Sequence, residues 1–351
     1  MDIPLTTTGN ISHLGQNYSF LTPILEQFQS SKKQIGIIHW WAIQPYVHKS
    51  DYEFLEFVQE LEKFVNSLDV CIVISEEMFG TSDSGTWLRR ETLYDMLDQY
   101  NTIYVSCSKE SLMPKGDTFE LPWFAKQSVV YSKKYIPVWK YYEPKQYTFN
   151  MLLGSEYGHR TYLFHSVDRS KVYTTYFGHP DLKSLSDTHL EDEKILDNLQ
   201  KQEVHLKKLN TFNHLGLPVS HTIPSLIYDN SHFDIVTETS IRNGFFFATE
   251  KTAKPLATGR WFISYAAHKY FEYMEKWGFD FTDYQIDYDV LEETYRLDLI
   301  VKKIREISDD IDLVKQIYAE TEPNRIHNKR IYDSLLESTY EDLTNFIASR
   351  I

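Results

Sequence analysis

A glutamate and two lysines stand between two strongly apolar runs in the segment FFFATEKTAKPLATGRWFI, residues 245–263. At the start of a helix, Lys251 and Lys254 would serve a phosphate group, because the helix N-terminus adds unpaired N–H groups and a partial positive charge. Glu250 beside them can accept two hydrogen bonds from a ribose diol. This spacing indicates half of a clamp for a nucleoside diphosphate, although Thr249 and Glu250 also suit ordinary helix capping and a first-turn lysine is often solvated.

The clamp requires a helix that begins directly after the first apolar run, at a corner where a strand turns into a helix. Pro255 has no backbone donor and is tolerated in a first turn, whereas Gly259 suits a helix C-terminus. A short helix is therefore predicted from near Thr252 to near Thr258.

A second group of polar residues follows an apolar run in MLLGSEYGHRTYLF, residues 151–164. Gly158, His159 and Arg160 stand at a predicted turn from a strand into a helix, where an arginine can bind phosphate oxygens with a two-pronged fork. A surface salt bridge is the ordinary alternative for Arg160. Glu238 ends a further strand, FDIVTETS, and is expected at the same edge of the sheet, either as a ligand group or as a strand-end acid with no task.

Alternating strands and helices must position these corners. Apolar runs of strand length alternate with helical patterns, which is typical of parallel sheets covered on both faces. Strands are expected at QIGIIHW, DVCIVIS, NTIYVSC, YTFNMLL, KVYTTYF, FDIVTET and RWFISYA, and helices at DYEFLEFVQELEKFVNSL, TWLRRETLYDMLDQY, GHRTYLFHSV, HLEDEKILDNLQKQEVHLKKL and HKYFEYMEKW. Residues 289–345 predict further acidic helices, broken at Pro323. Ligands bind such sheets at the carboxyl ends of the strands, and the absence of G-x-G-x-x-G after the first strand disfavours a dehydrogenase.

The order LLGSEYGHR, IYDNSHFDIVTETS, FFFATEKTAKPLATGRWFI and YFEYMEKWGFDF resembles the nucleotide-binding half of fucosyltransferase-like glycosyltransferases, closest to phage and bacterial members. The T-E-K block is the most specific part of the resemblance. It implies an α/β protein of the GT-B fold, with two facing Rossmann-like domains, parallel sheets and a helical C-terminal segment. The domains would be an N-terminal acceptor-side domain (1–147), a nucleotide-sugar-binding domain (148–285) and the C-terminal helices (286–351).

The resemblance also implies roles for the matching residues. Arg160 and Lys251 would bind the diphosphate, Glu250 would bind the ribose, and Glu238 would face the donor sugar or its anchoring loop. The chain departs from the family pattern at Arg260-Trp261, where the family usually has proline. The predicted donor-binding set is Gly158, His159, Arg160, Glu238, Thr249, Glu250, Lys251 and Lys254.

The implied reaction transfers a sugar from a UDP- or GDP-sugar to an acceptor hydroxyl, with inversion and with no metal or other cofactor, because the cations stabilise the leaving diphosphate. One DxD-like match, Asp287-Tyr288-Asp289, would suit a divalent metal, but it precedes a predicted helix, where acids commonly act as caps. The base is expected from the first domain. Its candidates, which also have ordinary interpretations as a packed ring or solvated loop acids, are His39, Glu76, Glu77 and Asp83.

Five lysines against one glutamate are interleaved with aromatic residues over residues 126–147. Such a pattern can hold single strands or extruded bases, it can stack on sugar rings, or it can be an amphipathic edge strand followed by a linker. The acceptor is accordingly a glycan or other small hydroxyl compound, or a hydroxymethylated pyrimidine in phage DNA. The predicted acceptor-binding residues are Lys133, Lys134, Trp139 and Tyr141.

The 351 residues include 42% apolar and 15% aromatic residues, which suffices for sizeable cores. The net charge of −14 divides into −9 for residues 1–120, +3 for 121–260 and −8 for 261–351, so only the middle favours an anion and the acidic flanks weigh against broad DNA affinity. Cys71 and Cys107 lie in apolar runs and are predicted as buried thiols. No signal segment or membrane-spanning run is evident, so the host or bacterial cytoplasm is expected.

A third interpretation belongs to another functional class. The chain could be a non-catalytic nucleotide-sugar-binding module that keeps the clamp without a base. Binding without turnover would distinguish such a module from an enzyme.

Overall fold

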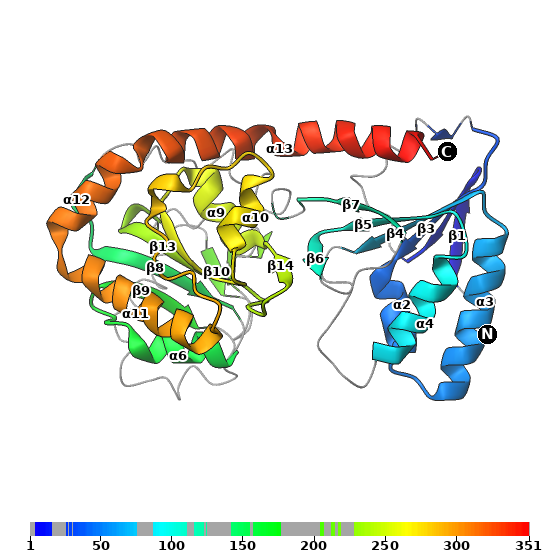
Figure 1. Cartoon of the computed structure of the whole chain (residues 1–351), viewed down its shortest axis with the longest axis horizontal. Helices are drawn as coiled ribbons and strands as arrows, with labels where there is room; N and C mark the ends of the chain where they lie inside the picture. Colours follow the sequence, from blue (N-terminus) through cyan, green and yellow to red (C-terminus); the bar gives the residue numbers. More distant parts are fainter. Residues whose placement is uncertain are drawn as a thin grey trace. The chain divides into compact units, whose positions relative to one another are not determined.

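The computed structural model describes residues 4–15, 26, 28–29, 31–75, 87–110, 116–122, 124, 142–154, 157–176, 204–206, 212–214, 217–218 and 228–350. The chain divides into two compact units, the first comprising Met1–Pro122 with Glu337–Ile351 and the second Trp123–Leu336 (Figure 1). The predicted boundary at residues 147/148 therefore lies inside the second unit, and the segment 286–351 is shared between the two. No described helix is both long and apolar enough to cross a membrane.

The first unit is built on a six-stranded sheet in the order β1-β2-β3-β4-β5-β7. The first two strands form an antiparallel hairpin, and all the remaining neighbouring pairs are parallel. Strands β3, β4 and β5 are buried along their whole length, as a sheet covered on both faces requires. The described strands of the first unit are β1 (Leu5–Thr8), β2 (Ile11–Leu14), β3 (Ile35–His39), β4 (Val70–Ser75), β5 (Thr102–Ser106), β6 (Ser108–Glu110), which is outside the six-stranded sheet, and β7 (Asp117–Glu120), and the helices are α2 (Trp40–Val47), α3 (Asp51–Asn66) and α4 (Trp87–Leu97).

Helix α3 illustrates how local signals set the elements of this unit. Ser50 caps it, because its hydroxyl accepts the backbone N–H of Glu53 while the Glu53 side chain accepts the backbone N–H of Ser50. Apolar residues at helical spacing then bury one face: Phe54, Phe57, Leu61 and Phe64. Both cysteines are buried, as predicted, and burial raises the pKa of the Cys71 thiol to about 12.

The second unit contains a four-stranded, wholly parallel sheet in the order β15-β13-β8-β9. From the central pair, the chain crosses outward from β8 through α6 to β9, and from β13 through α9 to β15. Since such crossovers are right-handed, the two helices lie on opposite faces of the sheet, as Figure 1 shows. The direction of winding therefore reverses between β8 and β13, and open α/β sheets bind ligands at the carboxyl end of such a switch point.

The other elements of the second unit complete its layers. Helix α11 packs against both α6 and the sheet. The strands are β8 (Tyr147–Leu153), β9 (Val172–Tyr176), β10 (Val204–Leu206), β11 (Phe212–His214), β12 (Leu217–Pro218), β13 (Ser231–Thr237), β14 (Phe245–Phe247) and β15 (Phe262–Tyr265), and the helices are α6 (Gly158–Ser166), α9 (Glu250–Thr258), α10 (Tyr270–Glu275), the 3-10 helix η2 (Thr282–Tyr284), α11 (Glu293–Asp309), α12 (Ile311–Glu320) and α13 (Glu322–Ala348), which continues into the first unit.

The predicted elements are confirmed with two corrections. Helix α9 begins at Glu250 rather than near Thr252, because Thr249 is its N-cap, and Pro255 consequently lies in the second turn. Residues 204–206, predicted within a long polar helix, form β10 and pair antiparallel with β11, so pairing with the next strand overrides the helical pattern. The rest of that predicted helix lies outside the described residues.

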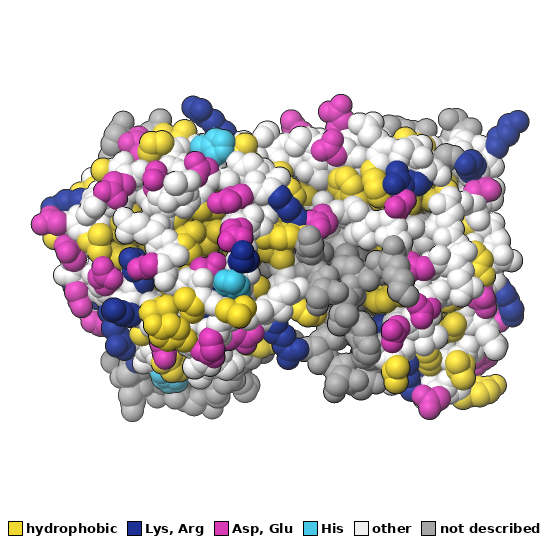
Figure 2. Space-filling view, viewed as in Figure 1, with side chains coloured by type: hydrophobic (Ala, Val, Ile, Leu, Met, Phe, Trp, Pro, Cys, Tyr) yellow, Lys and Arg dark blue, Asp and Glu magenta, His cyan; other side chains and the backbone are white. Residues whose placement is uncertain are grey.

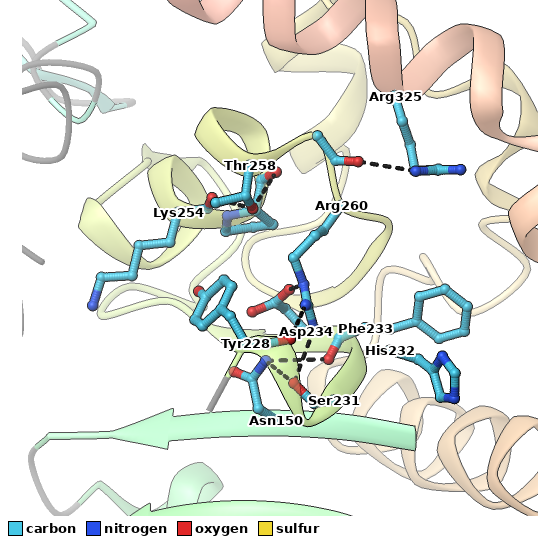
Figure 3. A network of polar contacts seen from close by, with 12 residues as sticks. Asn150, Tyr228, Ser231, His232, Phe233, Asp234, Lys254, Thr258, Arg260 and Arg325 are labelled. Carbon is cyan, nitrogen blue, oxygen red and sulfur yellow. Dashed lines mark hydrogen bonds and ion pairs between the residues drawn. The ribbon is translucent and has the colours of Figure 1, made fainter. Parts of the chain in front are cut away.

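A buried ion pair fixes the amino end of the sheet of the second unit (Figure 3). Arg260 Nε lies 2.5 Å from Asp234 Oδ2, and both side chains are at most 4% exposed. Arg260 also donates to the Tyr228 carbonyl at 2.8 Å and to Ser231 Oγ at 3.0 Å. Arg260 therefore holds the chain before β15 against the middle of β13.

Removal of one partner should leave a buried charge without compensation. Asp234→Ala is expected to lower the free energy of unfolding by about 3–5 kcal/mol, as measured by urea denaturation followed by circular dichroism. The matched control is Asp287→Ala, which removes the partner of Lys303 from a pair whose aspartate side chain is 66% exposed. That change should cost at most about 1 kcal/mol, and equal effects of the two substitutions would contradict a structural role for the buried pair.

Candidate functional site

The predicted donor-binding residues all lie in the second unit, next to the carboxyl ends of β8 and β13. Gly158 is the first residue of α6, and His159 and Arg160 complete its first turn. Glu238 follows the last residue of β13. The remaining members belong to the N-cap and first turns of α9: Thr249, Glu250, Lys251 and Lys254.

Glu238 is fully buried and accepts four hydrogen bonds from residues of α9, its cap and α10. Its Oε1 accepts the backbone N–H of Thr249 at 3.0 Å, the hydroxyl of Thr252 at 2.6 Å and the hydroxyl of Tyr270 at 3.1 Å. Its Oε2 accepts the Thr249 hydroxyl at 2.6 Å. Burial, and then the charge of Glu238, hold the pKa of Tyr270 well above its usual value, so the phenol remains a donor. The Glu238 carboxyl therefore positions the start of α9; of the two roles that the resemblance implies, contact with the sugar or with its anchoring loop, these bonds suit the second.

The start of α9 carries a partly open ion pair. Lys251 Nζ lies 2.9 Å from Glu250 Oε1 and 3.3 Å from the Thr249 hydroxyl. The Lys251 and Glu250 side chains are 16% and 19% exposed. Burial would raise the pKa of Glu250, but the charges of Lys251 and Lys254 outweigh it and lower that pKa to about 2. Glu250 is consequently an ionised acceptor at every physiological pH.

Lys254 is the buried member of this cluster. Burial, more than the nearby charge of Lys251, lowers its pKa to about 8, although Glu250 acts in the opposite direction. Figure 3 shows its side chain extending away from the Arg260 network. Its positive charge therefore acts on Glu250 and Lys251 at the start of α9. That charge is partly lost near neutral pH, because the pKa is about 8.

The α6 corner holds a buried arginine and a neutral histidine. Arg160 is 2% exposed, and its Nη2 donates to the Thr237 carbonyl at 3.1 Å. The ring of His159 bonds to the backbone of Glu238, where it donates to the carbonyl. Burial, followed by the positive charges of Arg160 and Lys251, lowers the pKa of His159 to about 4, so its imidazole is neutral at pH 7.

The two corners share one electrostatic environment. Lys251, on α9, contributes to the pKa of His159, on α6. A continuous set of contacts also links the two predicted cations: Arg160 bonds to Thr237, the neighbouring Glu238 holds Thr249, and Thr249 bonds to Lys251. Chemically, this arrangement offers two cations and two helix N-termini to an anion, with the Glu250 carboxylate beside them as an acceptor.

Of the predicted catalytic bases, only His39 lies within the described residues. It is the N-cap of α2 in the first unit, and its Cβ lies 2.7 Å from the point where a side chain on Gly15 would begin. Burial lowers the pKa of His39 to about 4, which leaves a neutral imidazole. The predicted residues outside the described ranges are Glu76, Glu77, Asp83, Lys133, Lys134, Trp139 and Tyr141.

The DxD-like motif makes protein contacts. Asp287 Oδ2 lies 3.3 Å from Lys303 Nζ, and Asp289 Oδ2 accepts the backbone N–H of Lys269 at 3.0 Å. Within the part of the chain that the structure describes, no three potential metal-ligating side chains gather in one place.

Sequence reasoning missed the residues that assemble the corners. Thr252 and Tyr270 both bond to Glu238, and Tyr157 lies over Arg160. The threonine could have been suspected from its place in the T-E-K-T run. Tyr270 is 32 residues from Glu238 in the sequence, and no local sequence pattern predicts their contact.

No protein-family profile and no curated protein matches the sequence. The fold and site together define an α/β protein whose second unit carries a cationic cluster at the switch point of a parallel sheet. Function is therefore inferred from chemistry at that cluster.

The charge coupling at the α9 corner can be measured directly. Lys251→Met is expected to raise the pKa of Glu250 from about 2 toward or above 4.5, because burial then acts with less opposition. The check is a carboxyl ¹³C titration by NMR. The lowered pKa stabilises the fold above pH 4.5 and this contribution disappears as the pH falls toward 2, so the substitution should also flatten the acid side of the stability profile.

The control is Lys269→Met, which breaks an exposed pair with Glu272 and should leave the Glu250 titration unchanged. A Glu250 that titrates near 4.5 in the unsubstituted protein would contradict the coupling.

Proposed function

We propose that this protein is a glycosyltransferase that moves a sugar from a UDP- or GDP-sugar to an acceptor hydroxyl. The observation that carries the proposal is the chain of contacts that links Arg160 and Lys251, from two strand-to-helix corners, through Thr237, Glu238 and Thr249 at the carboxyl end of a parallel sheet. A pyrophosphate with an attached ribose suits this arrangement, because the cations and helix N-termini serve the phosphates and Glu250 can accept the diol.

In the proposed reaction, negative charge develops on the leaving diphosphate as its bond to the sugar breaks. Lys251 and Arg160 stabilise that charge, and they do so more strongly than they would in water because their surroundings are largely buried. Lys254 adds charge from below the surface. Stabilisation of this kind is sufficient without a metal or another cofactor.

We further propose that the two units are the two Rossmann-like domains of a GT-B enzyme and that transfer is inverting. The acceptor hydroxyl must lose a proton, and the expected base belongs to the first unit. His39, Glu76, Glu77 and Asp83 remain its candidates. A neutral His39 can accept a proton, although a pKa of about 4 makes it a weak base at pH 7.

A glycan or another small hydroxyl compound is the favoured acceptor. Residues 261–351 carry a net charge of −8, and Figure 2 shows acidic side chains spread over α11, α12 and α13. DNA binding depends on neutralising phosphates, which this surface would oppose. Hydroxymethylated phage DNA stays as the alternative acceptor because of the lysines and rings in 126–147. The expected setting of the reaction is the cytoplasm.

The donor site is tested by calorimetric titration with UDP, GDP and their sugars. Lys251→Ala is expected to weaken binding of the preferred nucleotide about 10- to 100-fold, the loss typical of one charge-assisted hydrogen bond. The matched control is Lys329→Ala, a lysine of α13 that bonds to Asp333 at 2.7 Å. It should leave affinity unchanged.

Several outcomes separate the candidate functions. Binding without sugar transfer or donor hydrolysis would indicate the non-catalytic module, and transfer to hydroxymethylated DNA in place of glycans would reverse the acceptor assignment. If neither nucleotide binds, or if Lys251→Ala and Lys329→Ala behave alike, the donor site is assigned wrongly.

Donor affinity should also depend on the charge of Lys254. Because its pKa is about 8, affinity is expected to fall as the pH rises from 7 to 9, when the ammonium becomes neutral. In Lys254→Met this decline should be absent and affinity should be low throughout. A wild-type affinity that is constant over this range would contradict a contribution from Lys254.

A further inference from the structure

An exposed tyrosine lies over the arginine of the α6 corner. The Tyr157 side chain is 43% exposed, whereas Arg160 beneath it is only 2% exposed. The Arg160 guanidinium carbon lies 4.7 Å from the centroid of the Tyr157 ring. A ligand that approaches this face from solvent therefore meets the phenol ring before the guanidinium.

The same ring also lies against His159. The two rings are stacked, with centroids 5.8 Å apart and planes 13° apart, and Tyr265 contacts the imidazole at 5.4 Å. His159 Nε2 is buried and finds no hydrogen-bond partner among the described residues. The ring bonds to the Glu238 backbone, and because Nε2 has no partner we assign that bond to Nδ1–H, which leaves Nε2 as the acceptor of the neutral tautomer. A buried acceptor in this state is costly, which indicates that another group is meant to satisfy it.

We propose that the Tyr157 ring is a displaceable cover over Arg160 and His159, and that a ligand carrying both anionic oxygens and a hydroxyl takes its place. The inference rests on the proposed nucleotide-sugar site and specifies how the ligand enters it.

The ring is held weakly enough to move. Within the part of the chain that the structure describes, its ring contacts are the faces of Arg160 and His159, and Tyr157 makes no side-chain cap to α6. Gly158 follows Tyr157 directly, and a Cβ added there would meet no described atom within 4 Å. The described residues therefore leave space beside the backbone of the tyrosine.

The uncovered pair defines the ligand. Arg160 can only donate hydrogen bonds and the bare His159 Nε2 can only accept one. A phosphate oxygen matches the first group, and a ribose or sugar hydroxyl matches the second. Inorganic pyrophosphate lacks the hydroxyl, so His159 should distinguish a nucleoside diphosphate from pyrophosphate.

Removal of the cover should strengthen binding. In Tyr157→Ala, the affinity for UDP or GDP is expected to rise about tenfold, the factor expected when a ligand no longer displaces two ring-face contacts, and the association rate should rise with it. Both are measured by calorimetry and stopped-flow fluorescence. The matched control is Tyr162→Ala, a tyrosine of the same helix that is 45% exposed and bonds to Asp298 at 2.7 Å. It should change neither quantity.

A second variant tests His159 Nε2 as the hydrogen-bond acceptor. His159→Asn keeps a donor near the position of Nδ1 but removes Nε2, and it leaves the charge at pH 7 unchanged. It is expected to weaken nucleoside diphosphate binding about 5- to 10-fold, the worth of one neutral hydrogen bond, while affinity for pyrophosphate stays constant.

The outcomes separate this inference from the proposed function. If nucleotides bind the unsubstituted protein and Tyr157→Ala binds them equally or more weakly, the ring is not a cover, although the donor site stands. If His159→Asn weakens the binding of pyrophosphate as much as that of the nucleotide, His159 Nε2 is not the hydrogen-bond acceptor for a ligand hydroxyl. If neither the unsubstituted protein nor Tyr157→Ala binds any nucleotide, the proposed function fails together with the cover.

Discussion

One buried carboxyl group holds the candidate site together. Glu238 leaves the end of β13 and accepts hydrogen bonds from the cap and first turn of α9 and from Tyr270. Because an unsatisfied buried polar group is expensive, loss of any of these four contacts would be costly. They fix where α9 begins, and hence where Glu250 and Lys251 lie relative to the α6 corner. The ligand-facing residues are thus placed by a residue that itself has no exposed surface.

The cluster of cations is tolerated because each positive charge has a different kind of neighbour. Lys251 pairs with Glu250, the planar face of Arg160 lies against an aromatic ring, and Lys254 gives up part of its charge through a lowered pKa. The nearby imidazole of His159 is neutral for the same reason of burial. Such a combination of cations and helix N-termini suits an anionic ligand.

Local patterns in the sequence were sufficient for most elements and for the two corners. The short length and β-branched residues of the buried run VCIVIS and the helical spacing of the apolar face of α3 allow few alternatives, and the glycine after α9 adopts the left-handed conformation expected of a helix end. The contacts that assemble the site were not predictable in this way. The bond between Tyr270 and Glu238 joins residues 32 positions apart. Helix α9 begins two residues before its predicted start because the contact between Glu238 and Thr249 determines where it begins. Non-local partners decide such details, and one sequence carries no record of them.

Two buried arginines of the second unit, Arg160 and Arg260, differ in the helix end that they occupy, and this difference separates a structural role from a ligand-binding one. Arg160 and Arg260 are equally buried, and each lies near a helix end, Arg160 two residues after Gly158 and Arg260 directly after Gly259. Arg260 comes after the C-terminus of α9, where the helix dipole favours a cation, and a carboxylate completes its surroundings. Arg160 lies in the first turn of α6, where the dipole disfavours a cation by about 0.3–1 kcal/mol, and Lys251 occupies the same unfavourable position on α9. Two cations at two helix N-termini are a poor choice for stability alone, and a bound diphosphate would relieve both conflicts at once.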